Sequence, residues 1–265
     1  MNTTAARVRR YLPAIVVFVA GIAIWEGVIR GLGIRAFILP APSSIIGALA
    51  KNWDAGYQIF PAARTTLQEA AGGLIGGALL GLVVAFAVAR FPTARDIVLP
   101  IGIAVNAIPI VAFAPIANHW FGSQSAYSKM AIAGALVFFP IMINVLRGLT
   151  QVDDSALELM RSYAANEMAV LRKVRIPNAL PFFLTGLKIG TTLSLIGAVV
   201  GEYFGGLNVA LGRVVVESAS TLSFEVTWAA ILVVSVTGIV MYLAVTGLER
   251  VLIPWHQSVR GERLA

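Results

Sequence analysis

The sequence contains no cysteine, and only 12% of its 265 residues are charged. The absence of cysteine excludes disulfide bonds and thiolate metal sites. The scarcity of charge argues against an ordinary soluble domain, in which about 25% of residues are charged. The two histidines, His119 and His256, are far apart in the sequence and form no metal-ligand motif. We therefore predict no metal site and no cofactor.

Motifs for catalysis are also missing. The sequence has no G-x-x-x-x-G-K-S/T phosphate loop, so it cannot hydrolyse ATP through a P-loop. No nucleophile–base pair suited to an intramembrane enzyme can be assembled from it. The formal net charge of +7 would suit nucleic acid, but no basic patch interleaved with aromatic residues accompanies it. The sequence therefore predicts no catalytic residues and no nucleic-acid partner.

Apolar residues, by contrast, are abundant: they make up 58% of the chain. Six apolar segments are long enough to cross a bilayer, which takes about 20 helical residues. We therefore predict an all-α membrane protein with about six transmembrane helices. The expected spans are 12–29, 70–89, 97–117, 130–146, 182–200 and 227–248.

The second predicted span is rich in glycine. Glycines at small-xxx-small spacing allow two membrane helices to approach closely. We expect this span to pack tightly against a neighbouring helix through its glycines, Gly72, Gly73, Gly76, Gly77 and Gly81.

The distribution of lysine and arginine predicts the orientation. With the N-terminus in the cytoplasm, thirteen basic residues fall in cytoplasmic segments and six in outer segments, and Lys188 lies inside the fifth span. This asymmetry follows the positive-inside rule with both termini cytoplasmic. The expected organisation is a cytoplasmic tail (1–11), a first span retained rather than cleaved as a signal peptide (12–29), an extracytoplasmic connector (30–69), a membrane-spanning core (70–250) and a cytoplasmic tail (251–265).

A polar segment, 151–181, interrupts the apolar sequence between the fourth and fifth predicted spans. It contains four acidic and four basic residues. Ser155 and Glu158 have the spacing of a capping box, so a short helix is expected to begin there. Asn166 is a favourable N-cap for a second short helix, which Pro177 is expected to end. On the cytoplasmic side, this pair of helices would present a surface to a water-soluble partner.

The same segment resembles a known motif. The acidic Glu158 is followed six positions later by the small residue Ala164, and a β-branched residue precedes proline at Ile176 and Pro177. In its position between the fourth and fifth spans, this pattern resembles the EAA coupling loop of ABC (ATP-binding cassette) importer permeases, on which the ATPase subunit docks. The resemblance implies that the coupling residues are Glu158, Arg161, Ala164, Ala165, Asn166, Ile176 and Pro177.

Ala164 departs from the family pattern, which usually has glycine there. If the turn between the two helices requires a left-handed backbone, alanine costs about 1 kcal/mol relative to glycine. The alternatives are that the turn is right-handed in this chain, or that Asn166 adopts the special conformation instead.

The resemblance extends over nearly the whole chain, to permeases of the nitrate/sulfonate/taurine-type importers. The segment 39–43 resembles their extracellular connector, which precedes an amphipathic helix expected here at 43–53. Within that group, 184–206 is more similar to permeases for hydroxymethylpyrimidine, other pyrimidines or riboflavin. The resemblance implies a permease subunit of an ABC importer for a small organic solute, such as a pyrimidine or other heteroaromatic vitamin precursor. Sulfonate, taurine or nitrate is the alternative.

The resemblance also implies partners and a location. The partners are ABC ATPase subunits, a periplasmic or lipid-anchored solute-binding protein, and a second permease copy in a homodimer, all at the bacterial inner membrane and its lipid. Six spans alone are few for an enclosed path, which favours the dimer. The alternative of a different class is an ion-coupled secondary carrier, which needs ionisable groups near the membrane centre. The predicted spans have almost none there.

Prolines and polar residues within the spans are candidates for the translocation path. A proline frees a backbone carbonyl, which either faces a wet path or is satisfied by packing. For the hydroxyl groups the alternative is a hydrogen bond to their own helix, and for the carboxylate it is a place at the membrane interface. The candidates are Asn106, Pro109, Pro140, Thr191, Ser194 and Glu202.

Overall fold

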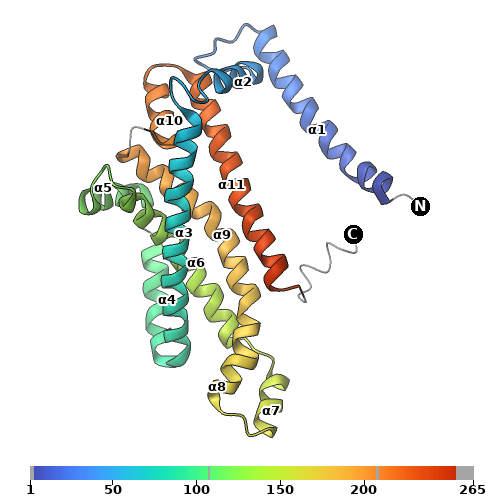
Figure 1. Ribbon diagram of the computed structural model, residues 1–265, viewed down its shortest axis with the longest axis vertical. Helices are drawn as coiled ribbons and strands as arrows, with labels where there is room; N and C mark the ends of the chain where they lie inside the picture. The colour runs from blue at the N-terminus through green and yellow to red at the C-terminus, as the bar shows by residue number, and fades with distance from the viewer. Residues whose placement is uncertain (1–2, 107, 207–208, 255–265) are drawn as a thin grey trace.

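The computed structural model describes residues 3–106, 108–206 and 209–254, and this part of the chain is built from helices and turns (Figure 1). By length and composition, five helical segments of it can cross a membrane: α1, α3, α6, the continuous α8–η1–α9 and α11. This confirms the prediction of an all-α membrane protein.

The elements are α1 (Thr3–Gly31), α2 (Pro42–Lys51), α3 (Ile59–Arg90), α4 (Pro92–Asn106), α5 (Ile110–Phe121), α6 (Ala126–Thr150), α7 (Asp154–Ser162), α8 (Glu167–Val170), the π-helix η1 (Leu171–Arg175), α9 (Ile176–Phe204), α10 (Leu211–Ser220) and α11 (Phe224–Leu252).

The third predicted span is not one helix, so the expectation of a continuous helix over 97–117 was wrong. It is divided into α4 and α5, and neither is long enough to be one of the five candidate spans. Pro109 lies at the division, in an extended conformation at the N-cap of α5 (φ −61°, ψ 114°). Proline lacks an N–H and disfavours a helical conformation in the residue before it, which explains the break.

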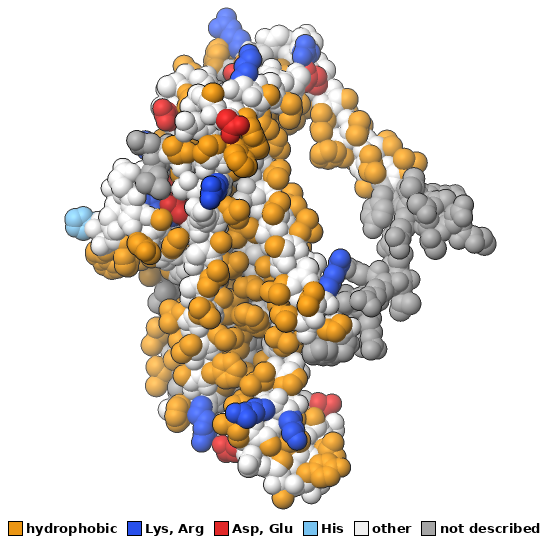
Figure 2. Space-filling model, viewed as in Figure 1, with side chains coloured by type: hydrophobic (Ala, Val, Ile, Leu, Met, Phe, Trp, Pro, Cys, Tyr) orange, Lys and Arg blue, Asp and Glu red, His pale blue; other side chains and the backbone are white. Residues whose placement is uncertain are grey.

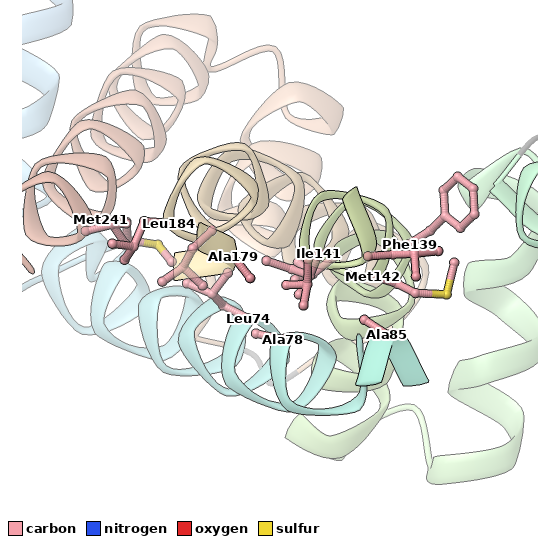
Figure 3. Close-up of a cluster of buried hydrophobic side chains, with 14 of the residues drawn as sticks. Leu74, Ala78, Ala85, Phe139, Ile141, Met142, Ala179, Leu184 and Met241 are labelled. Carbon is pink, nitrogen blue, oxygen red and sulfur yellow. The ribbon is translucent and has the colours of Figure 1, made fainter. Parts of the chain in front are cut away.

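Three long helices, α3, α6 and α9, form the core of the protein and make most of the contacts between helices. Their shared interface is apolar: Val137, Ile141 and Leu184 are fully buried. Figure 3 shows Leu74 of α3 and Leu184 of α9 in this layer, with Ile141 of α6 beside them. Figure 2 shows that hydrophobic side chains also cover the middle of the molecule, while charged ones gather mainly towards its two ends. This pattern is that of a bundle embedded in a bilayer.

Glycine allows α3 to approach α6 closely, as the sequence predicted. A Cβ atom added at Gly77 would lie 2.5 Å from the backbone oxygen of Gly134, and one at Gly81 would lie 2.7 Å from that of Phe138. Backbone atoms of a packed helix cannot move aside cheaply. Gly76, the exposed neighbour of Gly77, has no atom within 4 Å of its added Cβ. Only part of the glycine-rich stretch therefore serves helix packing.

The two ends of the bundle differ in structure. At one end, which we call the loop end, α7 and α8 extend beyond the long helices; at the other, the α10 end, α2 and α10 lie across them (Figure 1). A second apolar cluster at the α10 end joins α2, α3, α10 and α11 through Ile45, Ile59, Leu211 and Val226. The amphipathic helix expected at 43–53 is α2. The sequence did not predict α10, and α3 begins eleven residues before the predicted second span.

The first helix stands away from the bundle (Figure 1). Only 6% of its apolar window is buried, and Val17 is 72% exposed. Its contacts are at its C-terminal end. There Glu26 accepts hydrogen bonds from the backbone N–H and the hydroxyl of Ser43 in α2. The rings of Trp25 and Trp228 also pack edge to face, with their centroids 5.6 Å apart. The exposed apolar surface of α1 requires lipid or another subunit to cover it.

We expect Gly77→Val to destabilise the bundle by about 1–3 kcal/mol, because its side chain would meet a backbone that cannot yield. Thermal unfolding of the protein in detergent measures the change. Gly76→Val is the matched control on the same helix, and its added methyl groups meet open space. Equal melting temperatures for the two variants would contradict the close α3–α6 contact.

Candidate functional site

The segment between α6 and α9 extends from the bundle at the loop end (Figure 1). It comprises α7, the turn after it, α8 and η1, and no residue of these three helical elements is buried. A peripheral segment that packs so little of itself against its own chain is available to a partner. We call it the coupling segment, 151–177.

The N-cap of α7 is Asp153, so the expected capping box of Ser155 and Glu158 was wrong. The Asp153 carboxylate accepts hydrogen bonds from the backbone N–H of Ser155 at 3.0 Å and from its hydroxyl at 2.9 Å. These two bonds favour the ionised form and lower the pKa of Asp153 below its usual value. Glu158 is exposed and is not part of this cap. Its carboxylate is free for another role.

The turn after α7 is left-handed at Ala164, where φ is 49°. The turn is closed by hydrogen bonds from the Ala164 N–H to the Arg161 carbonyl at 2.9 Å and from the Ala165 N–H to the Met160 carbonyl at 3.0 Å. Alanine thus occupies a conformation that glycine adopts without strain. Of the three alternatives left open by the sequence, this one holds.

Asn166 caps α8, as predicted. Its backbone is extended (φ −73°, ψ 164°), and its side-chain oxygen accepts a hydrogen bond from the Ala169 N–H at 2.9 Å. Asn166 therefore does not take the special conformation in place of Ala164. Arg161 is exposed, whereas Ala165 is half-buried in the turn.

Pro177 does not end the second helix, contrary to expectation. The chain runs from Glu167 to Phe204 without interruption, through the π-helix η1. In η1 the turns are wider than in an α-helix, and the Ile176 N–H donates a hydrogen bond to the Leu171 carbonyl, five residues earlier. Pro177 is the second residue of α9 and directly follows the π-helix. The wide turn accommodates the proline, and both Ile176 and Pro177 remain exposed.

The coupling segment also carries exposed apolar side chains that the sequence analysis did not single out. Leu159, Tyr163 and Met168 are 56%, 75% and 54% exposed. Leu159 and Tyr163 are four residues apart and so share one face of α7. Figure 2 shows hydrophobic side chains at this tip of the molecule, next to basic ones. The helical spacing of two large apolar residues in a polar segment was the available signal.

The base of the coupling segment is tied to the bundle by Asn178. Its side-chain amide donates to the carbonyls of Gly148 at 2.7 Å and Gln151 at 3.0 Å, at the end of α6. Gly148 faces the Ala179 backbone, where an added Cβ would come within 2.5 Å. The start of α9 and the end of α6 are thus held together. Asn178 was not predicted from the sequence.

The candidate path residues do not share one surface within this chain. Thr191 and Ser194 are fully buried, and their hydroxyls donate to carbonyls of their own helix, those of Lys188 at 2.7 Å and Thr191 at 3.0 Å. Pro140 is half-buried in α6 and Pro109 is exposed at the break between α4 and α5. Glu202 is fully buried near the end of α9. The side chain of Asn106 lies outside the described residues.

A hollow of about 480 Å³ opens between α9 and α11. Thr185, Lys188, Thr192 and Tyr242 line it, with two apolar neighbours. At its edge, the Lys188 ammonium pairs with the Glu249 carboxylate at 2.5 Å. Thr185 and Thr192 are exposed, so this face of α9 offers hydroxyl groups that the buried Thr191 and Ser194 do not.

We expect Ala164→Gly to stabilise the turn after α7 by about 1 kcal/mol, because it removes the strain at positive φ. Hydrogen–deuterium exchange of the α7 and turn amides should then slow severalfold. Ala156→Gly, inside α7, is the control of opposite sign, since glycine within a helix costs about 1 kcal/mol. Faster exchange in Ala164→Gly than in the parent chain would contradict the left-handed turn.

Comparison with known proteins bears on this site. The chain is 32% identical over 245 residues to the formylaminopyrimidine transport permease protein of Halalkalibacterium halodurans, covering 91% of this chain and 94% of that protein. It is 29% identical to the riboflavin transport system permease protein of Chloroflexus aurantiacus, covering 88% of this chain and 86% of that one. It is also 29% identical to the taurine transport system permease protein of Escherichia coli, over 90% of this chain and 88% of that protein.

The fold has a counterpart among solved structures. The crystal structure of an amino acid ABC transporter matches with a TM-score of 0.60 at 17% identity, over 73% of this chain and 94% of that one. Residues 77–254, well over half of the chain, match the family described as binding-protein-dependent transport system inner membrane component. The chain belongs to this family, whose members are the multi-pass permease subunits of ABC importers.

Proposed function

We propose that this permease subunit forms, together with a second copy of itself, the path by which a pyrimidine or another heteroaromatic vitamin precursor enters the cell. The family implies ATPase and solute-binding protein partners, and ATP hydrolysis on a separate subunit fits that architecture. The observation that carries the solute proposal is the 32% identity to a formylaminopyrimidine permease over nearly the full length of both chains. The riboflavin permease, which handles another heteroaromatic compound by its name, adds support.

Sulfonate, taurine or nitrate is the second candidate. The taurine permease of Escherichia coli is 29% identical over 90% of this chain, close to the values for the heteroaromatic group. Uptake specificity in a binding-protein-dependent importer depends on the solute-binding protein as well as on the permease. The experiment must therefore use the cognate set of subunits.

The coupling segment is proposed as the docking site of the ATPase, on the cytoplasmic side. The support is its geometry: a projecting pair of helices with exposed apolar side chains at Leu159 and Tyr163 and an exposed carboxylate at Glu158. An aromatic anchor surrounded by polar groups is typical of interface hot spots. Arg161, Ala164, Ala165, Asn166, Ile176 and Pro177 then shape and flank this surface. Both termini of the chain would lie in the cytoplasm.

The path itself is proposed to lie at the interface of the two copies. The exposed face of α9 with Thr185 and Thr192 and the break at Pro109 supply polar groups that need water or solute beside them in a bilayer. Asn106 adjoins the break. The buried Thr191, Ser194 and Glu202 and the half-buried Pro140 would support this face from within each copy.

We expect Tyr163→Asp to weaken ATPase docking by about 2 kcal/mol or more, roughly 30-fold, because it replaces an exposed aromatic anchor with a charge. Glu158→Lys should weaken docking in the same direction by reversing a charge on the same helix. Co-purification of the ATPase with the tagged permease, followed by its titration, measures the effect.

The control for these variants is Leu222→Asp, which changes an exposed apolar residue at the α10 end. Its ATPase should remain bound with parental affinity. Retention of parental affinity by Tyr163→Asp would show that the ATPase does not dock on α7.

Uptake by the reconstituted importer tests the solute. We expect proteoliposomes that contain the permease, its ATPase and its binding protein to accumulate labelled formylaminopyrimidine when ATP is supplied. Taurine, an alkanesulfonate and nitrate at tenfold excess should not compete. Omission of the binding protein is the control and should abolish uptake. Accumulation of taurine or nitrate instead would replace the pyrimidine proposal with the second candidate.

A further inference from the structure

Three ionisable side chains from three different helices meet at the α10 end of the bundle. They are Glu69 of α3, Lys129 near the start of α6 and Glu202 near the end of α9, and their exposed fractions are 1%, 0% and 0%. Each of the three interacts electrostatically with the other two. Buried ionisable groups at membrane depth are costly and persist where they are paired or have a function. None of the three belongs to the coupling segment or to the hollow beside α9.

Glu202 and Lys129 have hydrogen-bond partners that suit their charged forms. Glu202 Oε2 accepts a hydrogen bond from the Gly212 N–H at 2.6 Å, in the first turn of α10. The neighbouring Leu211 N–H donates to Thr66 Oγ1 at 3.0 Å. The amide groups at a helix N-terminus favour a negative charge, so α10 stabilises Glu202 as a carboxylate. Lys129 donates to the Ser123 carbonyl and supplies the positive charge.

Glu69 has no such partner. Both of its carboxyl oxygens are buried without a hydrogen-bond partner, whereas the Thr66 hydroxyl lies within hydrogen-bonding reach of the Glu202 carboxylate. Yet the carboxyl groups of Glu69 and Glu202 lie within hydrogen-bonding reach of each other. Two carboxylates cannot form a hydrogen bond, since neither can donate, whereas a protonated carboxyl donates to a carboxylate. The missing donor is therefore supplied if one of the two carries a proton.

Charge balance leads to the same conclusion. Two carboxylates and one ammonium would bury a net negative charge, while a carboxylic acid, a carboxylate and an ammonium are neutral together. We propose that Glu69 is a proton-binding site, a neutral carboxylic acid that donates its proton to the Glu202 carboxylate. Glu202 in turn pairs with Lys129 and holds the first turn of α10.

The proton makes this end of the permease sensitive to pH. Without it, Glu69 and Glu202 would repel each other, and α3 would be pushed from the corner where α9 meets α10. The other elements packed here add few charges: α5 contributes the neutral Asn118, which donates to the Gly201 carbonyl, and α10 contributes Arg213, which packs beside Gly206 and lines a separate surface hollow. The α10 end is therefore expected to loosen as the pH rises.

Infrared difference spectroscopy detects the proton directly. In the full-length permease bound to its ATPase, a protonated carboxyl group gives a C=O stretching band that shifts in deuterated water. We expect this band at neutral pH in the parent protein and its loss in Glu69→Gln. Glu217→Gln, which changes an exposed acid of α10, should retain the band. Persistence of the band in Glu69→Gln would overturn the proposal.

Thermal stability provides a second, independent measurement. Glutamine mimics the neutral acid in shape and can donate to Glu202, so Glu69→Gln should melt no lower than the parent at neutral pH. The parent should melt at progressively lower temperature as the pH is raised into the alkaline range, and Glu69→Gln should lack this decline. Glu202→Gln should melt lower than both, because it leaves Lys129 without its negative partner. A loss of stability or assembly in Glu69→Gln equal to that in Glu202→Gln would show that Glu69 is an ionised partner of Lys129, contrary to the proposal.

Discussion

The close packing of α6 against α3 and α9 is the constraint on which the rest of the structure depends. Within a bilayer, apolar surface alone does not hold helices together, since lipid is equally apolar, so association depends on close van der Waals contact. Gly77 on α3 and Gly197 on α9 supply it by allowing backbone contact with Gly134 and Ala133 of α6. These contacts place the ends of all three helices in register. The coupling segment and the buried charges therefore occupy defined positions at opposite ends.

In the middle of the bundle the helices are held together by apolar packing, whereas at its two ends they are joined by hydrogen bonds. At the loop end, Asn178 joins the start of α9 to the carbonyls at the end of α6. At the other end, Glu202 joins the end of α9 to the first turn of α10. One helix, α9, thus carries both links.

Two groups of charged residues in this permease differ in how their charges are stabilised. Most of those in the coupling segment are exposed, so water stabilises each ion. Glu69, Lys129 and Glu202 are buried, and each must be stabilised by the others or by α10. They lie between four helices, so in the proposal above the protonation of Glu69 affects how those helices pack.

The sequence by itself determined the fold class, the approximate position of the long helices and the polar coupling segment, because hydropathy and polarity are local properties. It also determined the Asn166 cap, since an N-cap acts on amides within its own turn. Tertiary structure decided what depends on neighbours or on competition between similar residues. Asp153 and Ser155 are both good caps, and the sequence analysis chose the wrong one. Pro177 is a residue type that often ends a helix, but here the π-helix before it lets the helix continue. The meeting of Glu69, Lys129 and Glu202 was invisible in the sequence because they are brought together only by the packing of three helices, and Glu69 had been assigned to a connector. Features within one helix, such as its hydropathy and its caps, can be predicted from its own residues. Contacts between helices depend on how the whole bundle packs.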